Sequence, residues 1–242
     1  MSGHSHAKTI KHDKEISDKK RGALFSKIAR MISVAAREKG GDPKINYSLR
    51  MAIDKAREIN MPQENVERAI KRGTGETEGG SQLAEVVFEA YGPGGVAIII
   101  EGITDNKNRA LGGIKQILNQ NGGKLVGEGA VKWMFERKGV IIINIKDLVV
   151  NKEDLEMRAI EAGAEDIYWH NDVLDVYTKT DDLEQVKNNL EDKGIKIKSA
   201  GLDLVAKEVV GVSGKEMEEC QKLFEALDEN DDVQEIYSNL KD

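Results

Sequence analysis

The sequence predicts an α+β protein in which an N-terminal three-helix bundle is followed by two α/β domains, the ferredoxin-like βαββαβ one inserted in the other. Three observations support this fold class. Apolar residues recur at helical spacing from about residue 17 to residue 73. A glycine-rich segment then interrupts the pattern, and segments typical of strands and helices alternate after it. At 242 residues, the chain is long enough for two or three small domains.

Three helices are expected in the N-terminal region. The first begins near Ser17–Asp18 and ends at Gly40–Gly41, because glycine commonly follows a last helical turn. The second runs from about 48 to 59. The third begins with Pro62, which suits a first helical position, and ends at Gly73. Three short helices joined by tight turns form a small bundle.

The middle of the chain changes to a strand-rich pattern. Residues 73–82 are mainly glycine and polar residues and are typical of a linker. Strands at Glu85–Tyr91 and Val96–Ile103 are expected to form a hairpin. A helix is predicted at Asn108–Asn121 and a further strand at Ala130–Glu136.

A self-contained βαββαβ pattern, the order of a ferredoxin-like unit, occupies residues 140–204. Its strands are expected at 140–145, 166–170, 173–178 and 196–204, and its helices at 152–162 and 181–193. A helix at 215–227 and a strand at 233–237 cannot bury themselves alone, so we expect them to return to the sheet of the middle region. The predicted domains are 1–78 (basic arm and helical bundle), 79–137 plus 207–242 (middle α/β domain) and 138–206 (inserted ferredoxin-like domain).

Charge is distributed unevenly along the chain. Residues 1–72 contain 17 Lys and Arg against 9 Asp and Glu, a balance of +8. The remaining residues have a balance of −15, which gives the net charge of −7. A uniformly acidic protein repels phosphate backbones, whereas a basic arm attached to acidic domains can bind them with one end. The distribution therefore predicts an N-terminal region that faces nucleic acid.

The first predicted helix carries cations beside its apolar stripe. Lys20, Lys27, Arg30 and Arg37 share one arc, and we expect the N-terminal arm and the third helix to extend this surface. The candidate nucleic-acid-binding residues are Lys8, Lys11, His12, Lys14, Lys19, Lys20, Arg21, Lys27, Arg30, Arg37, Arg68, Lys71 and Arg72. Because helices commonly carry Lys and Arg on their solvent side, a merely solvated face is the alternative interpretation.

Base-specific recognition has little support in the first domain. Asn46, Tyr47 and Gln63 are its evident candidates for reading or stacking bases. Neither a helix-turn-helix spacing nor an aromatic RNA-recognition strand motif is present. The sequence favours contacts to phosphates and to nucleic-acid shape over base readout.

The residues of the chain match no catalytic, metal or nucleotide pattern. His4, His6 and His12 lack the spacing of a structural zinc site. The glycine-rich turns lack the strand–loop–helix context of a phosphate loop, and no nucleophile elbow or Cys–His pair occurs. Adjacent acids such as Asp231–Asp232 are interpreted as solvated faces or helix caps. We expect no enzyme activity, cofactor, metal or small-molecule substrate.

The compartment expected from the sequence is the cytoplasm. No apolar run approaches the length of a membrane span, and the N-terminus lacks the apolar stretch of a secretory signal. The single cysteine, Cys220, excludes an intrachain disulfide and is expected to be partly buried on a helix. No membrane partner is expected.

Two polar turns are candidates for contact with a second partner surface, such as ribosomal RNA or a protein. One joins the strands of the predicted hairpin, and the other places amides, a lysine and an arginine before a helix. The residues concerned are Tyr91, Pro93, Gly94, Asn106, Lys107, Asn108 and Arg109. Capping of the helix by Asp105 or Asn106 is an equal alternative for the second turn.

The combined motifs resemble the YebC/PmpR family, which includes the mitochondrial translational activator of cytochrome c oxidase subunit one. The similarity extends over essentially the whole chain. The matching segments are Gly3-His-Ser5, Ile10-Lys-His12, Lys20-Arg-Gly22, Phe25-Ser-Lys27, Asn60-Met-Pro62, Glu67-Arg-Ala-Ile-Lys-Arg-Gly73, Tyr91-Gly-Pro-Gly-Gly95, Asp105-Asn-Lys-Asn-Arg109, Gly129-Ala-Val131, Gly163-Ala-Glu-Asp166, Asp175-Val-Tyr177 and Asp231-Asp-Val-Gln-Glu-Ile-Tyr237. The family usually has Trp-Ala where this chain has Ala7-Lys8, so an indole contact in the arm is missing here.

The resemblance implies the same three domains and no enzymatic activity. It also implies one of two functions, because the family carries an older label of DNA-binding transcriptional regulator and a newer one of ribosome-associated factor that relieves stalled translation. From residues and resemblance together we expect a non-enzymatic nucleic-acid-binding regulator of gene expression. A ribosome- or rRNA-associated translation factor is the favoured form, and a regulator bound to duplex DNA is the alternative.

Overall fold

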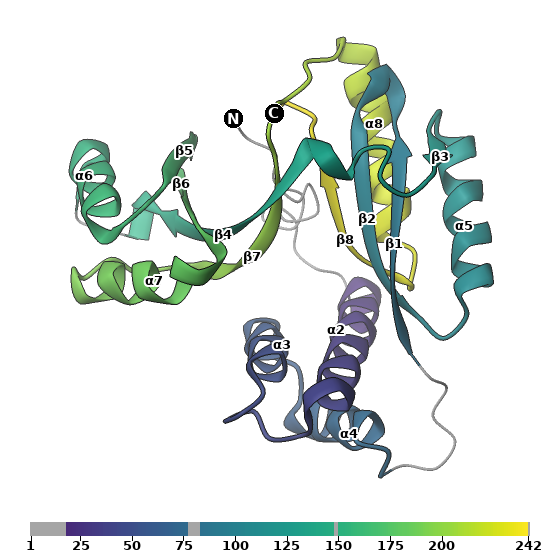
Figure 1. The fold of residues 1–242 in the computed structure, drawn as a ribbon, viewed down its shortest axis with the longest axis horizontal. Coiled ribbons are helices and arrows are strands. Elements are labelled where there is room, and N and C mark those ends of the chain that lie inside the picture. The colour runs from purple at the N-terminus through teal and green to yellow at the C-terminus, as the bar shows by residue number, and fades with distance from the viewer. Residues whose placement is uncertain (1–17, 77–82, 148–149, 242) are drawn as a thin grey trace. The chain divides into compact units, whose positions relative to one another are not determined.

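The computed structural model describes residues 18–76, 83–147 and 150–241 (Figure 1). These residues form helices followed by two four-stranded antiparallel sheets with further helices, so the predicted α+β class is confirmed. They divide into two compact units, residues 18–132 with 212–238 and residues 133–211 with 239–241. The finer division into three domains stays a prediction.

A three-helix bundle begins the described chain. Its helices are α2 (Asp18–Lys39), α3 (Tyr47–Glu58) and α4 (Gln63–Gly73), each within two residues of the expected bounds. Helix α2 packs against both α3 and α4. Ile32, Leu49 and Ala56 are completely buried in the core between them. Burial of this apolar stripe supplies the main stabilisation, since helices this short are marginal in isolation.

Asn46 connects the end of α2 to the start of α3. Its buried side-chain amide donates hydrogen bonds to the carbonyl oxygens of Ala35 at 2.8 Å and Gly40 at 2.7 Å. Its side-chain oxygen accepts the backbone N–H of Leu49 at 3.0 Å and so caps α3. One side chain thus satisfies backbone groups at both helix ends.

The first sheet has the strand order β3-β1-β2-β8. Its strands are β1 (Ala84–Tyr91), β2 (Ala97–Thr104), β3 (Lys124–Val126) and β8 (Val233–Ser238). Helices α5 (Lys107–Gln120) and α8 (Gly214–Asp228) pack against each other and against this sheet. Because β8 pairs with β2, the expected return of the C-terminal segment to the first sheet is confirmed.

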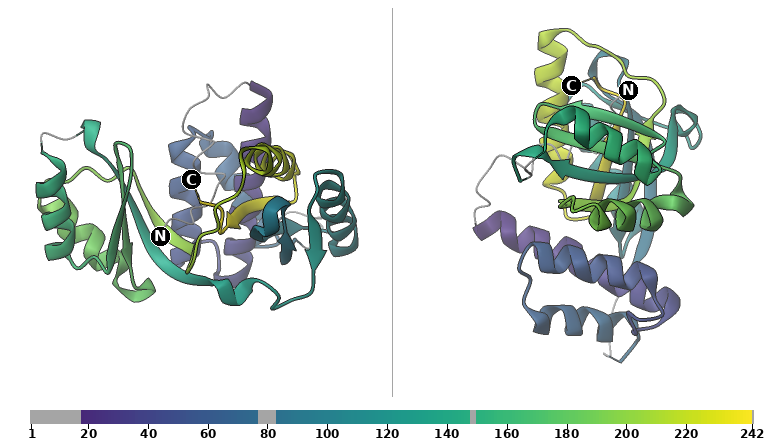
Figure 2. Two further views of the ribbon diagram at one scale, coloured as in Figure 1. Left: turned by 90° about the horizontal axis from the view of Figure 1, so that it is seen from above. Right: turned by 90° about the vertical axis from the view of Figure 1, so that its left-hand side faces the viewer.

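The second sheet has the order β5-β6-β4-β7, which is the ferredoxin-like arrangement of a βαββαβ chain. Its strands are β4 (Phe135–Asn144), β5 (Asp166–His170), β6 (Val173–Thr178) and β7 (Ser199–Ala206). Helices α6 (Lys152–Ala162) and α7 (Leu183–Asp192) lie on one face of the sheet, as Figure 2 shows.

Short 3₁₀ turns occur at η1 (Pro93–Gly95), η2 (Lys132–Met134), η3 (Ile145–Asp147) and η4 (Thr180–Asp182).

The expectation of a strand at 130–136 was wrong. The buried carboxylate of Glu89 on β1 accepts the backbone N–H groups of Gly129 at 2.6 Å, Val131 at 2.7 Å and Lys132 at 3.0 Å. These bonds fold the segment into a turn, and β4 begins only at Phe135. Val131 is buried, as an inward-facing strand residue would be. The hydrogen bonds that determine the structure, however, come from Glu89, which lies 40 positions before Gly129.

Candidate nucleic-acid interface

Part of the predicted phosphate-binding set cannot be placed. Lys8, Lys11, His12 and Lys14 lie outside the described residues, and so do the side chains of Lys19 and Lys20. The described side chains of this region begin with Arg21, which is exposed in the first turns of α2. The structure therefore bears on the bundle and not on the arm.

Lys27 is directed into the protein. Its side chain is only 8 % exposed, and its Nζ lies 3.0 Å from Oδ1 of Asp228, at the end of α8. The same nitrogen donates to the backbone carbonyl of Asp228 at 2.5 Å. A buried ammonium group requires such partners, because leaving it unpaired is costly. Lys27 therefore joins α2 to the α/β part of its unit.

Arg30, one turn further along α2, binds the same region. Its guanidinium lies 2.9 Å from the buried carboxylate of Asp232 and donates to the carbonyl oxygens of Asp231 at 2.6 Å and Ile103 at 3.2 Å. Oδ1 of Asp232 also lies 3.2 Å from the Arg109 guanidinium. A single carboxylate thus holds two arginines from separate elements.

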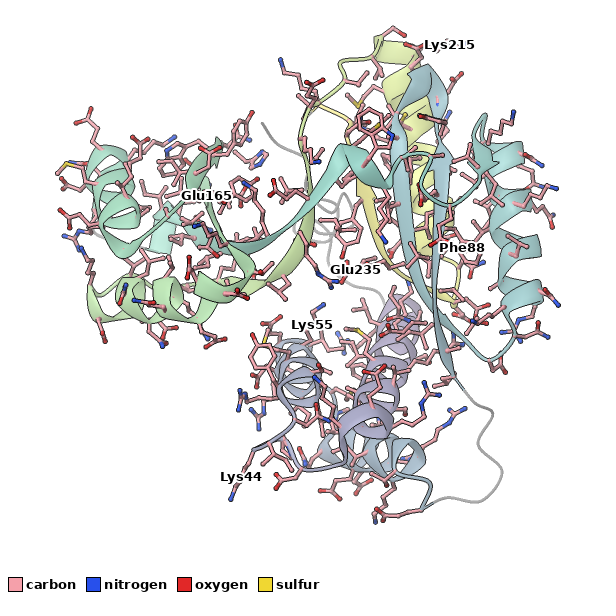
Figure 3. All side chains as sticks on the ribbon, viewed as in Figure 1. Lys44, Lys55, Phe88, Glu165, Lys215 and Glu235 are labelled. Atoms are coloured by element: carbon pink, nitrogen blue, oxygen red, sulfur yellow. The ribbon has the colours of Figure 1, made fainter. Side chains whose placement is uncertain are left out.

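Two further cations of the bundle have internal partners. Arg37 donates to the backbone carbonyl of Leu83. Lys55 on α3 lies 3.2 Å from Glu235 on β8, and Figure 3 shows this pair where the bundle meets β8. We call Lys27, Arg30 and Lys55 the inner cations, because each pairs with an acidic side chain of the α8–β8 region.

A second set of cations is exposed. These outer cations are Lys44, Arg50, Arg68, Lys71 and Arg72. Within the described chain none of the five forms an ion pair; Arg68 donates to Asn65 at 3.1 Å, and the Arg50 guanidinium lies 5.3 Å from the ring centre of Tyr47. Figure 3 places Lys44 at the end of the bundle remote from Glu235.

The predicted set is therefore divided by the structure. Arg68, Lys71 and Arg72 lie together on α4 and are exposed, whereas Lys27 and Arg30 are paired internally. Lys44 and Arg50 also belong to the exposed set, although they were not predicted as phosphate-binding residues. The signal for them was present, since Arg50 falls three residues after Tyr47 on the polar face of α3.

The acids of the α8–β8 connection were misinterpreted. The sequence predicts a solvated or capping pair at Asp231–Asp232. Asp231 is exposed, but Asp232 is 7 % exposed and holds Arg30 and Arg109. Alternating exposure of two adjacent identical residues has no local sequence signature. The distinction is made by contacts that are more than 120 residues apart.

The two candidate partner loops are separated by the whole of β2. The turn at 92–95 precedes this strand and the turn at 105–109 follows it, so they lie roughly 25 Å apart for an eight-residue strand. Tyr91 is half-buried, Pro93 is buried and Gly94 is exposed. Because of this separation, the two loops cannot act as one compact contact surface.

The second loop has a clear structural role. Asn106 caps α5 by accepting the N–H of Arg109 at 3.0 Å. The Arg109 side chain binds Asp105 at 2.7 Å, and this hydrogen bond holds the pKa of Asp105 below its ordinary value. Lys107 and Asn108 are exposed.

No metal or reactive site is evident in the described chain. No group of three or more metal-ligating side chains occurs among residues 18–76, 83–147 and 150–241. Cys220 is completely buried rather than partly buried, and burial, followed by Glu216 and Glu219, raises its pKa to about 11. A thiol with this pKa is a poor nucleophile at neutral pH. No helix in these ranges has the length and hydropathy that a membrane crossing needs.

Two family models match this chain. One describes the TACO1/YebC protein N-terminal domain and matches residues 5–76; the other describes the TACO1/YebC second and third domain and matches residues 83–240. Together they span nearly the whole sequence.

Relatives of known sequence and structure agree with these models. A protein of Halothermothrix orenii called a probable transcriptional regulatory protein is 48 % identical over 99 % of this chain and 95 % of its own length. One of Pseudothermotoga lettingae with the same description is 50 % identical over 100 % of this chain and 94 % of its own. The crystal structure of a conserved hypothetical protein from Aquifex aeolicus matches with a TM-score of 0.85 and 42 % identity, covering 96 % of this chain and 95 % of that one.

Proposed function

This chain belongs to the TACO1/YebC family, and from this premise we propose that it is a non-enzymatic, nucleic-acid-binding regulator of gene expression in the cytoplasm. Its favoured form is a translation factor that associates with ribosomal RNA and relieves stalled ribosomes. The outer cations are the observation that supports the proposal best. Five exposed basic side chains on one small bundle, none of them ion-paired within the described residues, are available to phosphates.

The mechanism follows from the two sets of cations. Inner cations fix the bundle to the acidic α8–β8 region, and outer cations contact phosphate oxygens. The acidic remainder of the protein repels the polyanion, so binding through the bundle orients the molecule. The basic arm extends the same contact in this proposal. Phosphate contacts of this kind position a protein without selecting a sequence.

Binding of duplex DNA as a transcriptional regulator is the second candidate. The observation that favours it is the description of the relatives as probable transcriptional regulatory proteins. The outer cations serve a DNA backbone equally well, because phosphate contacts are common to both nucleic acids.

Cosedimentation with ribosomes across a salt series tests the proposal. We expect the wild-type protein to pellet with ribosomes at low salt and to dissociate as salt rises. The variant Lys71→Glu/Arg72→Glu is expected to dissociate at a lower salt concentration. Lys115→Glu/Lys222→Glu is the matched control, because it makes the same charge change at exposed positions of α5 and α8. Equal behaviour of both variants, or binding that survives nuclease treatment, would contradict the proposal.

A competition titration separates the two candidates. Labelled promoter DNA and ribosomes are offered together at physiological salt. Preference for ribosomes is expected of the translation factor, whereas a tenfold or greater preference for the DNA would establish the transcriptional alternative.

A further inference from the structure

The helical bundle contains a pocket that phosphate binding does not use. It lies where the first turns of α2 meet the turn between α3 and α4, and it has a volume of about 490 Å³. This volume falls within the range of small-molecule sites in proteins. The described residues that line it all belong to the bundle.

Three of the sequence segments that match the family pattern meet at this pocket. Lys20-Arg-Gly22 contributes Arg21, Phe25-Ser-Lys27 contributes Phe25, and Asn60-Met-Pro62 contributes Asn60 and Pro62. More than 30 residues separate the first two segments from the third. The fold therefore assembles them, and neither Phe25 nor Asn60 has a role in holding phosphates.

The walls of the pocket are apolar and its rim is polar. Leu24, Phe25 and Ile59 are only partly buried although they adjoin the bundle core, so apolar surface is left accessible. An accessible phenyl ring beside aliphatic groups is the usual surface on which an unpaired base stacks.

Asn60 supplies a hydrogen-bonding group at the rim. It is exposed, and it adopts a left-handed backbone conformation with φ of 55°. Its backbone N–H donates to the carbonyl oxygen of Arg57 at 3.0 Å, while its side-chain amide forms no hydrogen bond within the described chain. An amide offers both a donor and an acceptor, which is the combination that reads a base edge.

Arg21 and Glu58 complete the rim with opposite charges. An arginine can hold a phosphate or stack on a base, and a glutamate accepts hydrogen bonds from exocyclic amino groups.

We propose that this pocket binds one unpaired nucleobase of the nucleic acid that the bundle holds. Phe25 stacks on the base and Asn60 bonds its edge. The inference rests on the proposed function and adds a substrate class to it: single-stranded or looped segments, since bases stacked within a duplex cannot enter. A peptide segment is the competing occupant, and the test below separates the two.

Two variants remove the base contacts while keeping the backbone and the charge. Phe25→Leu keeps an apolar side chain and removes the ring. Asn60→Gly removes the amide and tolerates the positive φ. Thermal unfolding followed by circular dichroism checks that each variant remains folded. If Phe25→Leu does not fold, Asn60→Gly still provides the test.

The measurement is fluorescence anisotropy of the full chain with a 12-nucleotide single-stranded RNA and with a duplex of the same sequence. We expect each variant to bind the single strand about five- to tenfold more weakly than wild type. Duplex affinity is expected to stay within twofold. An RNA with 2-aminopurine at one position adds a direct readout, because stacking on Phe25 changes the fluorescence of the base.

Each other result has a defined meaning. If folded variants bind both RNAs as the wild type does, the pocket is not a base site and the inference is overturned, while phosphate binding by the outer cations stands. Equal loss for single strand and duplex overturns it too. If wild type binds neither RNA, the proposed function fails together with the inference, and the pocket is left to a peptide.

Discussion

The inner and the outer cations of the helical bundle differ in environment although the sequence presents them alike. The Lys27 and Arg30 side chains are 8 % and 23 % exposed and lie within 3.0 Å of carboxylate oxygens. Lys71 and Arg72 on α4 are exposed and form no ion pair within the described residues. Net charge counts both sets equally, but only an exposed cation can exchange its counterions for a nucleic-acid phosphate.

The difference teaches that one basic segment serves two physical purposes. Partly desolvated cations are stabilising only with their partners present, so the inner set should affect folding when it is changed. Exposed cations contribute little to folding, so the outer set should affect binding. The comparison is sharpest where a mutation changes one property and leaves the other unaltered.

The largest effect is expected from Asp232→Ala, which leaves Arg30 without its carboxylate. The free energy of unfolding should fall by about 2–3 kcal/mol, somewhat less than for a completely buried pair, because Arg30 retains partial access to water. Urea unfolding of the full chain measures it. Asp231→Ala is the control, since its side chain is exposed and only its backbone carbonyl serves Arg30. Equal losses in the two variants would refute the distinction between neighbouring acids.

Glu89 is a buried carboxylate that is held by backbone N–H groups instead of an ion-pair partner. Burial opposes its ionised form, but the N–H groups of Val131, Gly129 and Lys132 outweigh burial and lower its pKa below the ordinary 4.5. Glu89→Gln should cost about 2 kcal/mol at neutral pH.

The pH dependence of unfolding checks the same residue. Because the folded pKa lies below the unfolded one, the contribution of Glu89 is complete above about pH 4.5 and is lost as pH falls through the lowered folded value. Wild type should therefore lose stability in that acidic range more steeply than Glu89→Gln. Parallel curves for the two proteins would count against the backbone bonds as the cause.

A binding effect of about tenfold is expected from Lys71→Glu/Arg72→Glu. The affinity for RNA should fall, and the log–log slope against salt should decrease by roughly 0.7 for each lost contact to a single strand. Anisotropy titrations at several salt concentrations measure both quantities. The unfolding midpoint is expected to stay the same, and an unchanged slope would remove α4 from the interface.

The smallest effect is expected from Lys55→Ala. Its partner Glu235 is mostly buried, but the Lys55 side chain is 38 % exposed, so solvent screens the pair. The expected loss is about 0.5 kcal/mol of unfolding free energy, with no change in RNA affinity. A loss comparable to that of Asp232→Ala would show that exposure is a poor guide to the strength of these contacts.

Local signals explain why the helices and most strands could be predicted. Glycines after α2 and proline before α4 mark helix ends directly, and the βαββαβ order follows from alternating periods. The segment at 130–136 could not be assigned, because Glu89 determines its shape from another strand. β4 was expected only from residue 140, since Arg137–Gly139 breaks its apolar pattern, yet it runs continuously beside β7.

Less of the candidate interface than of the fold could be predicted from the sequence. Helical periodicity places Lys27 and Arg30 beside the apolar stripe, but periodicity alone cannot show that another element covers that side. The covering residue Asp232 lies about 200 positions away. Such pairings depend on tertiary structure, so the sequence could predict a basic bundle but not which of its cations are exposed.

The amide of Asn46 has a consequence for how the bundle opens. Because the same side chain closes the last turn of α2 and the first turn of α3, neither end can fray without releasing the other. The backbone hydrogens of Gly40 and Leu49 should then exchange with deuterium at similar rates, as one opening event. These hydrogen bonds of Asn46 therefore fix the direction in which the first turn of α3, with Tyr47 and Arg50, leaves the end of α2.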